Sequence, residues 1–379
     1  MPRSKIEVLR TTAAEDVRRW DQLVDSSLVP DVYYRPAYVQ AYERAGRGQA
    51  VGLLVEGGTT QVLIPLLLRP LSELGFSHPE QGADAFTPYG YGGLSHLGGP
   101  VPPPPADVAA LVAALREWCL DTGIVCCLLR LHPMLGQEPW FASLHGSDCG
   151  ISLRQFGPTT AVNLTAWDAA ADCLTGMRKG RRSDLKAARR QLRVTWTSGG
   201  AGETGEPANP SLLARHLDLF YELYEGDMNR LNATAFYHFP REYYTSLATG
   251  LGSRLGLALA WHGEQAVGGS LFMADRCYGH YHLSAGTDLG RRLKAGTLLI
   301  NAGAAWTQQR GCRMLHLGGG VRAGDSLFEF KKGFGGVIYQ YSFVTLVADT
   351  RRYTTLVELR LREPTLPPPR PDFFPVYRA

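Results

Sequence analysis

The chain has 379 residues, of which 45% are hydrophobic and 20% are charged. This length exceeds one ordinary domain and fits two of about 150–200 residues, and the composition is typical of packed, soluble domains. Lys and Arg total 39 against 35 Asp and Glu, which gives a formal net charge of +4. So small an excess excludes a protein that coats nucleic acid through its overall charge, and any such contact would need a local basic patch.

The predicted elements of the first half begin with a hairpin. Residues 51–68, VGLLVEGGTTQVLIPLLL, read as an apolar strand, a turn and a second apolar strand. A Pro-rich connector at 98–107 precedes a helix that stops at Gly123, and residues 124–133 then read as a buried strand that ends at Pro133. This half therefore mixes strands with helices.

The second half continues this alternation. A basic helix is predicted over about 168–192, a loop over 198–210, a longer helix over 211–231 and a short helix after Pro240. Strands follow near 255–262, 266–275 and 278–287, then a helix at 295–311, the strand RMLHL, a Gly-rich turn, a short helix and a last strand. The hairpin at 257–274 repeats the pattern of 51–68, which indicates two related domains in tandem, with chance similarity as the alternative.

Several marks of location and chemistry are missing from the sequence. No apolar run reaches the length of a membrane span, and the first twenty residues have no signal-peptide core, so we expect a cytoplasmic protein without a membrane span. The seven cysteines show no metal-binding spacing, and neither a zinc site nor a disulfide framework is expected. GxSxG, HExxH and the phosphate-binding GxxxxGK[ST] are absent. Residues 318–323 match GxGxxA, but the next helix is short and no acid closes the next strand before Asp349, so dinucleotide binding is not expected.

Four segments carry a resemblance to a known family. They are YGYGG (89–93), YHLSAGT (281–287), MRKGRRSDLKAARR (177–190) and, most specific, LGGGVRAGDSLFEFKKGFGG (317–336). Together they resemble the Fem-type aminoacyltransferases and their GNAT-like relatives, most strongly over about 170–340. The central order of strands and helices is also the layout of a GNAT acyltransferase domain.

The resemblance implies an α/β fold of two tandem GNAT-like domains, each a mixed, largely antiparallel sheet flanked by helices. We expect an N-terminal domain at 1–157, a C-terminal domain at 158–345 and a Pro-rich tail at 346–379 that packs back on the first. The implied reaction moves an amino acid from aminoacyl-tRNA to an amine on a peptidoglycan precursor or a small natural-product intermediate. It needs no metal and no cofactor besides this co-substrate. A CoA-dependent N-acyltransferase and a non-catalytic binding protein are the alternatives, and the sequence does not indicate an oligomeric state.

The short helix of the most specific segment has its own internal pattern. Ser326 and Glu329 match a capping box, which would start the helix at Leu327. Leu327, Phe330 and Phe334 share one predicted core-facing stripe. The two lysines at 331 and 332 would then point away from the core.

The resemblance places the pair Phe330 and Lys331 at the reacting centre. A fixed cation together with backbone N–H groups can stabilise the oxyanion that forms when an ester is converted to an amide. Three consecutive glycines at 318–320 would allow the backbone to approach a ligand closely. A solvated lysine on a purely structural helix is the alternative.

Two basic stretches are candidates for contact with phosphates. The predicted basic helix carries a cluster that could bind tRNA or a nucleotide-linked acceptor, or could be an ordinary solvated face: Arg178, Lys179, Arg181, Arg182 and Lys186. The loop RRLKAG (291–296) stands where GNAT enzymes bind the CoA pyrophosphate, but Lys294 replaces the first glycine of their pattern. That departure favours another acyl carrier, although Arg292 and Lys294 remain phosphate-binding candidates beside a plain surface loop.

The remaining candidates are aromatic or polar. His280 and His282 share one strand face by the period of two, and a neutral histidine there could take a proton from the acceptor, although histidines in sheets are more often simply hydrogen-bonded. Loop position or the resemblance adds the others. The predicted substrate-binding residues are Tyr89, Tyr91, Arg230, Tyr237, His282 and Lys332.

Overall fold

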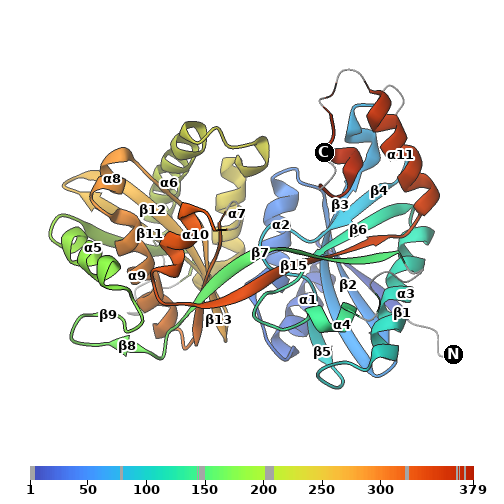
Figure 1. Ribbon diagram of the computed structural model, residues 1–379, viewed down its shortest axis with the longest axis horizontal. Coiled ribbons are helices and arrows are strands. Elements are labelled where there is room, and N and C mark those ends of the chain that lie inside the picture. Colours follow the sequence, from blue (N-terminus) through green and yellow to red (C-terminus); the bar gives the residue numbers. More distant parts are fainter. Residues whose placement is uncertain are drawn as a thin grey trace. The chain divides into compact units, whose positions relative to one another are not determined.

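The computed structural model of the protein describes residues 5–76, 80–142, 144, 150–200, 209–320, 324–363, 366, 368–370 and 373–379. The chain forms two compact units, of which unit 1 contains Met1–Phe156 with Tyr341–Ala379 and unit 2 contains Gly157–Gln340 (Figure 1). Each unit is a mixed sheet with helices on its faces, so the expected α/β class is confirmed. The units differ from the expected ranges at Gly157 and at 341–345. The second difference arises because β15 (Val337–Val347) begins in unit 2 and ends in unit 1.

Unit 1 is built on a sheet in the order β1–β2–β3–β4–β6–β15, with β5 beside β3. Its pairs are antiparallel except for β4 with β6. The strands other than β15 are β1 (Lys5–Arg10), β2 (Gln49–Gly57), β3 (Thr60–Pro70), β4 (Ala83–Phe86), β5 (Ser95–Gly98) and β6 (Ile124–Arg130).

Glycines on β2 allow the helices of unit 1 to approach the sheet closely. A Cβ at Gly57 would lie 2.8 Å from Leu111 Cγ on α3, and a Cβ at Gly52 would lie 2.9 Å from the ring of Trp20 on α1. Because residues 52 and 57 differ in parity, α1 and α3 cover opposite faces. The helices are α1 (Ala14–Ser26), α2 (Pro36–Arg44), α3 (Pro105–Asp121), α4 (Glu138–Ala142) and α11 (Thr350–Arg362).

The C-terminal stretch joins unit 1 through a buried polar network. Asp84 on β4 is almost fully buried and accepts hydrogen bonds from Arg69 at 2.8 Å and from Arg378. The ring of Tyr377 is also buried, and its hydroxyl lies 3.2 Å from Cys126 Sγ on β6. Within the expected tail range, α11 is a regular helix, which the later prolines do not reach.

Unit 2 has a sheet in the order β7–β14–β13–β12–β11–β10, antiparallel except for β13 with β14. It repeats the order hairpin, strand, helix, parallel strand that β2 to β6 show in unit 1. The strands are β7 (Ile151–Asn163), β10 (Arg193–Ser198), β11 (Leu255–His262), β12 (Gln265–Ala274), β13 (Tyr278–Gly286) and β14 (Met314–Gly319).

Neighbouring glycines on β12 mark the two faces of the sheet in unit 2. A Cβ at Gly268 would contact Ala295 on α9 at 3.3 Å, and a Cβ at Gly269 would contact Phe220 on α6 at 2.7 Å. Helices α6 and α9 therefore cover opposite faces. The helices are α5 (Lys179–Arg189), α6 (Pro210–Arg230), α7 (Arg241–Leu251), α8 (Asp288–Arg292), α9 (Ala295–Gln309) and α10 (Ser326–Lys332).

The predicted basic helix over 168–192 is wrong in its first part. Residues 167–174 form a small antiparallel ribbon of β8 (Trp167–Asp168) and β9 (Cys173–Leu174), and α5 begins only at Lys179. The apolar residues Leu174 and Met177 have helical spacing but are buried from the ribbon and the turn after it. Among the described residues, no helix is both long enough and apolar enough to cross a membrane.

Candidate functional site

The parallel pair β13 and β14 defines the centre of the candidate site in unit 2. The two strands pair only over Tyr278–His280 and Met314–His316, although β13 runs to Gly286 and β14 to Gly319. Beyond this short ladder each strand is held by its other neighbour, β12 or β7. The segment after β14 leads into α10, which brings Lys331 to this point.

Lys331 is a buried lysine with defined partners. Its Nζ donates a hydrogen bond of 2.7 Å to the carbonyl of Gly319 at the end of β14, and lies 5.7 Å from the ring centroid of Tyr281 on β13. Only 9% of the residue is exposed. Burial lowers the pKa of its ammonium to about 8, against an opposing effect of Asp325. At pH 7 the side chain is therefore mostly charged, in an environment that strengthens its electrostatic effect.

The predicted orientation of the short helix is wrong by one residue, and this is why Lys331 is buried. The N-cap is Asp325, whose carboxylate accepts from Phe328 N–H at 2.8 Å, so the helix begins at Ser326. Phe328 is buried and Leu327 is 41% exposed. Phe328 and Lys331, three residues apart, thus share the inward face. A helix capped by Ser326, as the sequence pattern predicts, would instead direct Lys331 toward solvent.

The three glycines before α10 have structural reasons of their own. Gly318 has a φ of +76° at a shift in the β14–β7 register, a conformation that favours glycine. A Cβ at Gly319 would lie 2.8 Å from the carbonyl of Pro158, and one at Gly320 would lie 2.1 Å from an oxygen of Asp325. The glycines therefore fit the turn to β7 and to the helix cap. Residues 321–323 of the GxGxxA match lie outside the described residues.

Phe330, the predicted partner of Lys331, is partly buried on the hydrophobic core of unit 2. Its ring packs edge-on against Phe334, with the centroids 5.5 Å apart. The guanidinium carbon of Arg181 lies 4.6 Å from the centroid of the same ring, and Arg181 also donates to Asp184 at 2.7 Å. Phe330 thus connects α10 to the basic helix α5.

The other basic candidates of this region differ in whether their charges are paired within the protein. Arg182 is a structural residue, since it donates to the Met177 carbonyl at 3.0 Å and to Asp168 at 3.3 Å. Arg178 lies 3.6 Å from Glu329, which also pairs with Lys332 at 3.0 Å. The remaining candidates of α5, Lys179 and Lys186, are exposed.

In the loop at the expected pyrophosphate position, several backbone N–H groups form hydrogen bonds within the loop. The backbone N–H groups of residues 290, 291, 293 and 294 all donate to oxygens of residues 287–291. Arg291 is paired with Asp288 and, at 3.0 Å, with Asp227. Arg292 is exposed, and so is Lys294, whose φ of +66° is the left-handed conformation that favours glycine. The loop therefore keeps the backbone shape of a glycine position without the glycine.

Strand β13 also carries two buried histidines, His280 and His282. His280 packs edge-on against His316 with the centroids 5.9 Å apart. The Nε2 of His282 lies 2.7 Å from the hydroxyl of Tyr243 on α7, a partner that sequence reasoning missed. Burial, and then His280, lower the pKa of His282 to about 3, so its ring is neutral at pH 7.

Two predicted substrate residues belong to unit 1. The carbonyl of Tyr89 accepts a hydrogen bond from the hydroxyl of Tyr38. The ring of Tyr91 packs edge-on against Tyr341 at 4.8 Å and against Tyr33 at 6.0 Å. Both tyrosines are partly buried within unit 1, whereas Lys331 belongs to unit 2.

The last two candidates lie at the end of α6. Arg230 donates to Asp227 at 2.6 Å and borders a hollow of about 660 Å³ between α6, the β11–β12 turn and the start of α8. Tyr237, in a short 3₁₀ turn, packs edge-on against Phe236 at 5.1 Å. Asp227 itself was missed, because its role depends on contacts with residues near position 290 that are far away in sequence.

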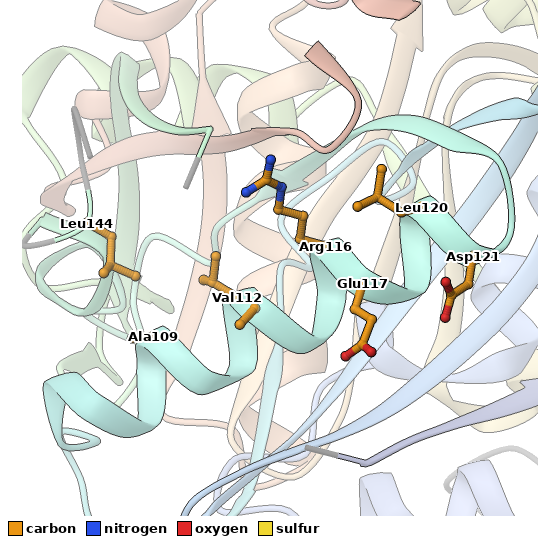
Figure 2. Close-up of a pocket in the computed structure, with 8 residues that line it drawn as sticks. Ala109, Val112, Arg116, Glu117, Leu120, Asp121 and Leu144 are labelled. Carbon is orange, nitrogen blue, oxygen red and sulfur yellow. The ribbon is translucent and has the colours of Figure 1, made fainter. Parts of the chain in front are cut away.

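A second hollow, of about 350 Å³, lies along α3 in unit 1. Figure 2 shows the side chains of Val112, Arg116 and Leu120 along this helix, with Leu144 nearby. The lining is mainly apolar, and it contains none of the residues predicted to form a site.

A comparison with known protein families matches one part of the chain. Residues 178–332, which hold the β13–β14 pair and Lys331, match the family model of the acetyltransferase (GNAT) domain. No curated protein matches the sequence significantly.

Solved structures extend the similarity to nearly the whole chain. The crystal structure of FemX matches with a TM-score of 0.63 at 13% identity, covering 92% of this chain and 99% of FemX. L-PGS from Bacillus licheniformis matches at 0.54 and 10% identity, covering 91% and 96%. The C-terminal domain of a putative lysylphosphatidylglycerol synthetase from Agrobacterium fabrum matches at 0.52 and 15%, covering 91% and 97%. The Fem-type resemblance is thereby confirmed at the level of the fold, which is similar to that of FemX over 92% of this chain.

Proposed function

We propose that this protein transfers an amino acid from aminoacyl-tRNA to an amine acceptor and so forms an amide bond. The observation that carries the proposal is the buried ammonium of Lys331 beside the end of the short β13–β14 ladder. Burying a charge lowers the stability of the fold, and an apolar side chain at the same position would remove this desolvation penalty. A buried lysine is therefore expected where its charge has a function. Stabilising the negative charge of an acyl-transfer intermediate is such a function.

In the proposed reaction the acceptor nitrogen attacks the carbonyl carbon of the ester. The carbon–nitrogen bond forms, and the carbonyl oxygen takes the negative charge that Lys331 stabilises. The tetrahedral intermediate then collapses, the bond to the tRNA ribose oxygen breaks, and that oxygen leaves as a hydroxyl with the proton that the nitrogen loses. The ester itself supplies the activation.

The ammonium group of the acceptor must lose a proton before it attacks, and His282 is not the base that accepts this proton. With a pKa of about 3, this histidine is too weak a base to hold a proton taken from an ammonium group. It is better suited to position the acceptor through the hydrogen-bonded pair that it forms with Tyr243. Proton loss to water or within the substrate is sufficient. The acceptor itself is a peptidoglycan precursor or a small natural-product intermediate.

The loop at 287–295 supports an aminoacyl ester rather than an acyl-CoA as donor. A pyrophosphate needs free backbone N–H groups and a near backbone, but four N–H groups of this loop are already used internally. Arg291 is neutralised by two carboxylates. The family match to GNAT acetyltransferases favours the second candidate function, an acyl-CoA-dependent N-acyltransferase.

A donor competition distinguishes the two functions. The protein is incubated with tRNA charged with labelled amino acids and, separately, with labelled acetyl-CoA, each with a panel of primary amines. The proposal expects label in a new amide only with aminoacyl-tRNA. Label transferred from acetyl-CoA alone would establish the second function and contradict the first.

A further inference from the structure

Three cations form one straight row on the solvent side of α5. Lys179, Lys186 and Arg190 stand at positions i, i+7 and i+11, which fall within about 40° of one another around a helix. Leu185 and Ala188, the buried residues of this helix, lie on the other side. We call these three residues the cationic row. Along the axis they are spaced by about 10 Å and about 6 Å.

The cationic row differs from the neighbouring basic residues because, among the described residues, its charges are not paired with carboxylates. The side chains of its three residues are exposed, and within the described residues they make no hydrogen bond or ion pair. The other basic residues of α5 and its flanks pair with carboxylates in the same unit: Arg178 with Glu329, Arg181 with Asp184, Arg182 with Asp168, Arg189 with Asp172 and Arg193 with Glu264.

The row begins next to the helix that carries Lys331. Arg178 N–H, one residue before the row, donates to the Gly333 carbonyl after α10 at 3.0 Å. One turn further, Arg181 lies over the ring of Phe330. These contacts fix α5 relative to α10 within unit 2. A ligand whose reacting end is held at Lys331 can therefore extend along the row.

We infer that the cationic row binds phosphates along one strand of the tRNA that carries the acyl group, and that the carboxylate-paired arginines do not. This inference rests on the proposed function. One strand of double-stranded DNA carries one charge per about 3.4 Å of helix axis, and on that scale a row of about 16 Å spans several phosphates. Exposed, flexible side chains suit contacts that hold a backbone in place without reading its sequence.

The test measures tRNA binding as a function of salt. Uncharged tRNA is titrated with the 379-residue protein between about 50 and 200 mM salt, so that binding is measured separately from transfer. The variant Lys179→Gln/Lys186→Gln/Arg190→Gln removes the row while keeping good helix formers. The control Arg18→Gln/Arg154→Gln/Arg351→Gln removes three exposed charges from unit 1. Thermal unfolding verifies that both variants fold like the wild type.

Each lost phosphate contact lowers the slope of log K against log salt by about 1. We therefore expect the row variant to lose about 3 from the slope and at least about tenfold in affinity at low salt, and the control to change little. An unchanged slope in the row variant, or an equal loss in the control, would overturn the inference and leave the proposed function standing. Wild-type protein that fails to bind tRNA at low salt would contradict both.

Discussion

Replacing Lys331 by methionine should make the protein more stable and lower its transfer rate by about 10²–10³. Methionine has nearly the same length, so the packing of α10 on β14 is kept while the charge is removed. The pKa of Lys331 falls from 10.5 to about 8 on folding, and 1.36 kcal/mol per pKa unit makes the buried charge cost about 3 kcal/mol at pH 7. The variant also loses the hydrogen bond to the Gly319 carbonyl, which lowers its stability by about 1 kcal/mol. A net gain of about 2 kcal/mol in the free energy of unfolding is expected.

The sign of the pH dependence follows from the same pKa. Below about pH 8 the lysine is charged in both the folded and the unfolded chain, so the full cost is present. Between about pH 8 and 10.5 the folded protein has lost this proton and the unfolded chain has not. The unfolded chain then binds more protons, and wild-type stability rises with pH relative to the variant. The advantage of Lys331→Met should shrink by about 2 kcal/mol between pH 7 and pH 9.5.

Urea unfolding of wild type and variant at pH 7 and pH 9.5 measures this difference, because all other titrating groups cancel between the two proteins. Lys332→Met is the matched control: its lysine is in an exposed pair with Glu329, so removing it should change stability by less than about 1 kcal/mol at either pH. If Lys331→Met were destabilised equally at both pH values, the buried-charge explanation would be refuted.

Three further substitutions test the local geometry. Gly320→Ala should cost about 2–4 kcal/mol because its Cβ would lie 2.1 Å from Asp325 Oδ1, whereas Gly180→Ala meets nothing within 4 Å and should cost nothing in urea unfolding. Lys294→Gly should raise stability by about 1 kcal/mol, since it relieves a φ of +66°; a loss would contradict this. Asp84→Asn should destabilise unit 1 by about 3–5 kcal/mol and expose the C-terminal stretch to limited proteolysis, because two guanidiniums lose their carboxylate; an unchanged digest would refute it.

The strands and the repeated hairpin could be predicted because their signals are local. Apolar runs bounded by turn residues locate β2 and β3 as well as β11 and β12 to within a few residues. Helix α11 has a weak sequence signal, because only Leu356 and Arg360 of its thirteen residues are buried. The basic helix was extended too far toward the N-terminus, because apolar residues at helical spacing also fit a ribbon that packs on the core.

At the candidate site, residue types were predictable and orientations were not. The phase of α10 depends on whether Asp325 or Ser326 caps it, and both are good caps, so the inward position of Lys331 could not be derived from the pattern. The pairing of Arg182 with Asp168 depends on the turn before α5. The contribution of Tyr281 requires the end of the β13–β14 ladder, which is a tertiary feature.

The central claim, that the Lys331 ammonium stabilises charge in acyl transfer, is tested most directly by single-turnover transfer from charged tRNA at pH 7. Wild type, Lys331→Met and the exposed-lysine control Lys5→Met are compared at saturating acceptor. Removing one donor to the oxyanion costs about 10²–10³ in rate. The account predicts a loss of that size in Lys331→Met and a wild-type rate in Lys5→Met. A Lys331→Met rate within about threefold of wild type would contradict it.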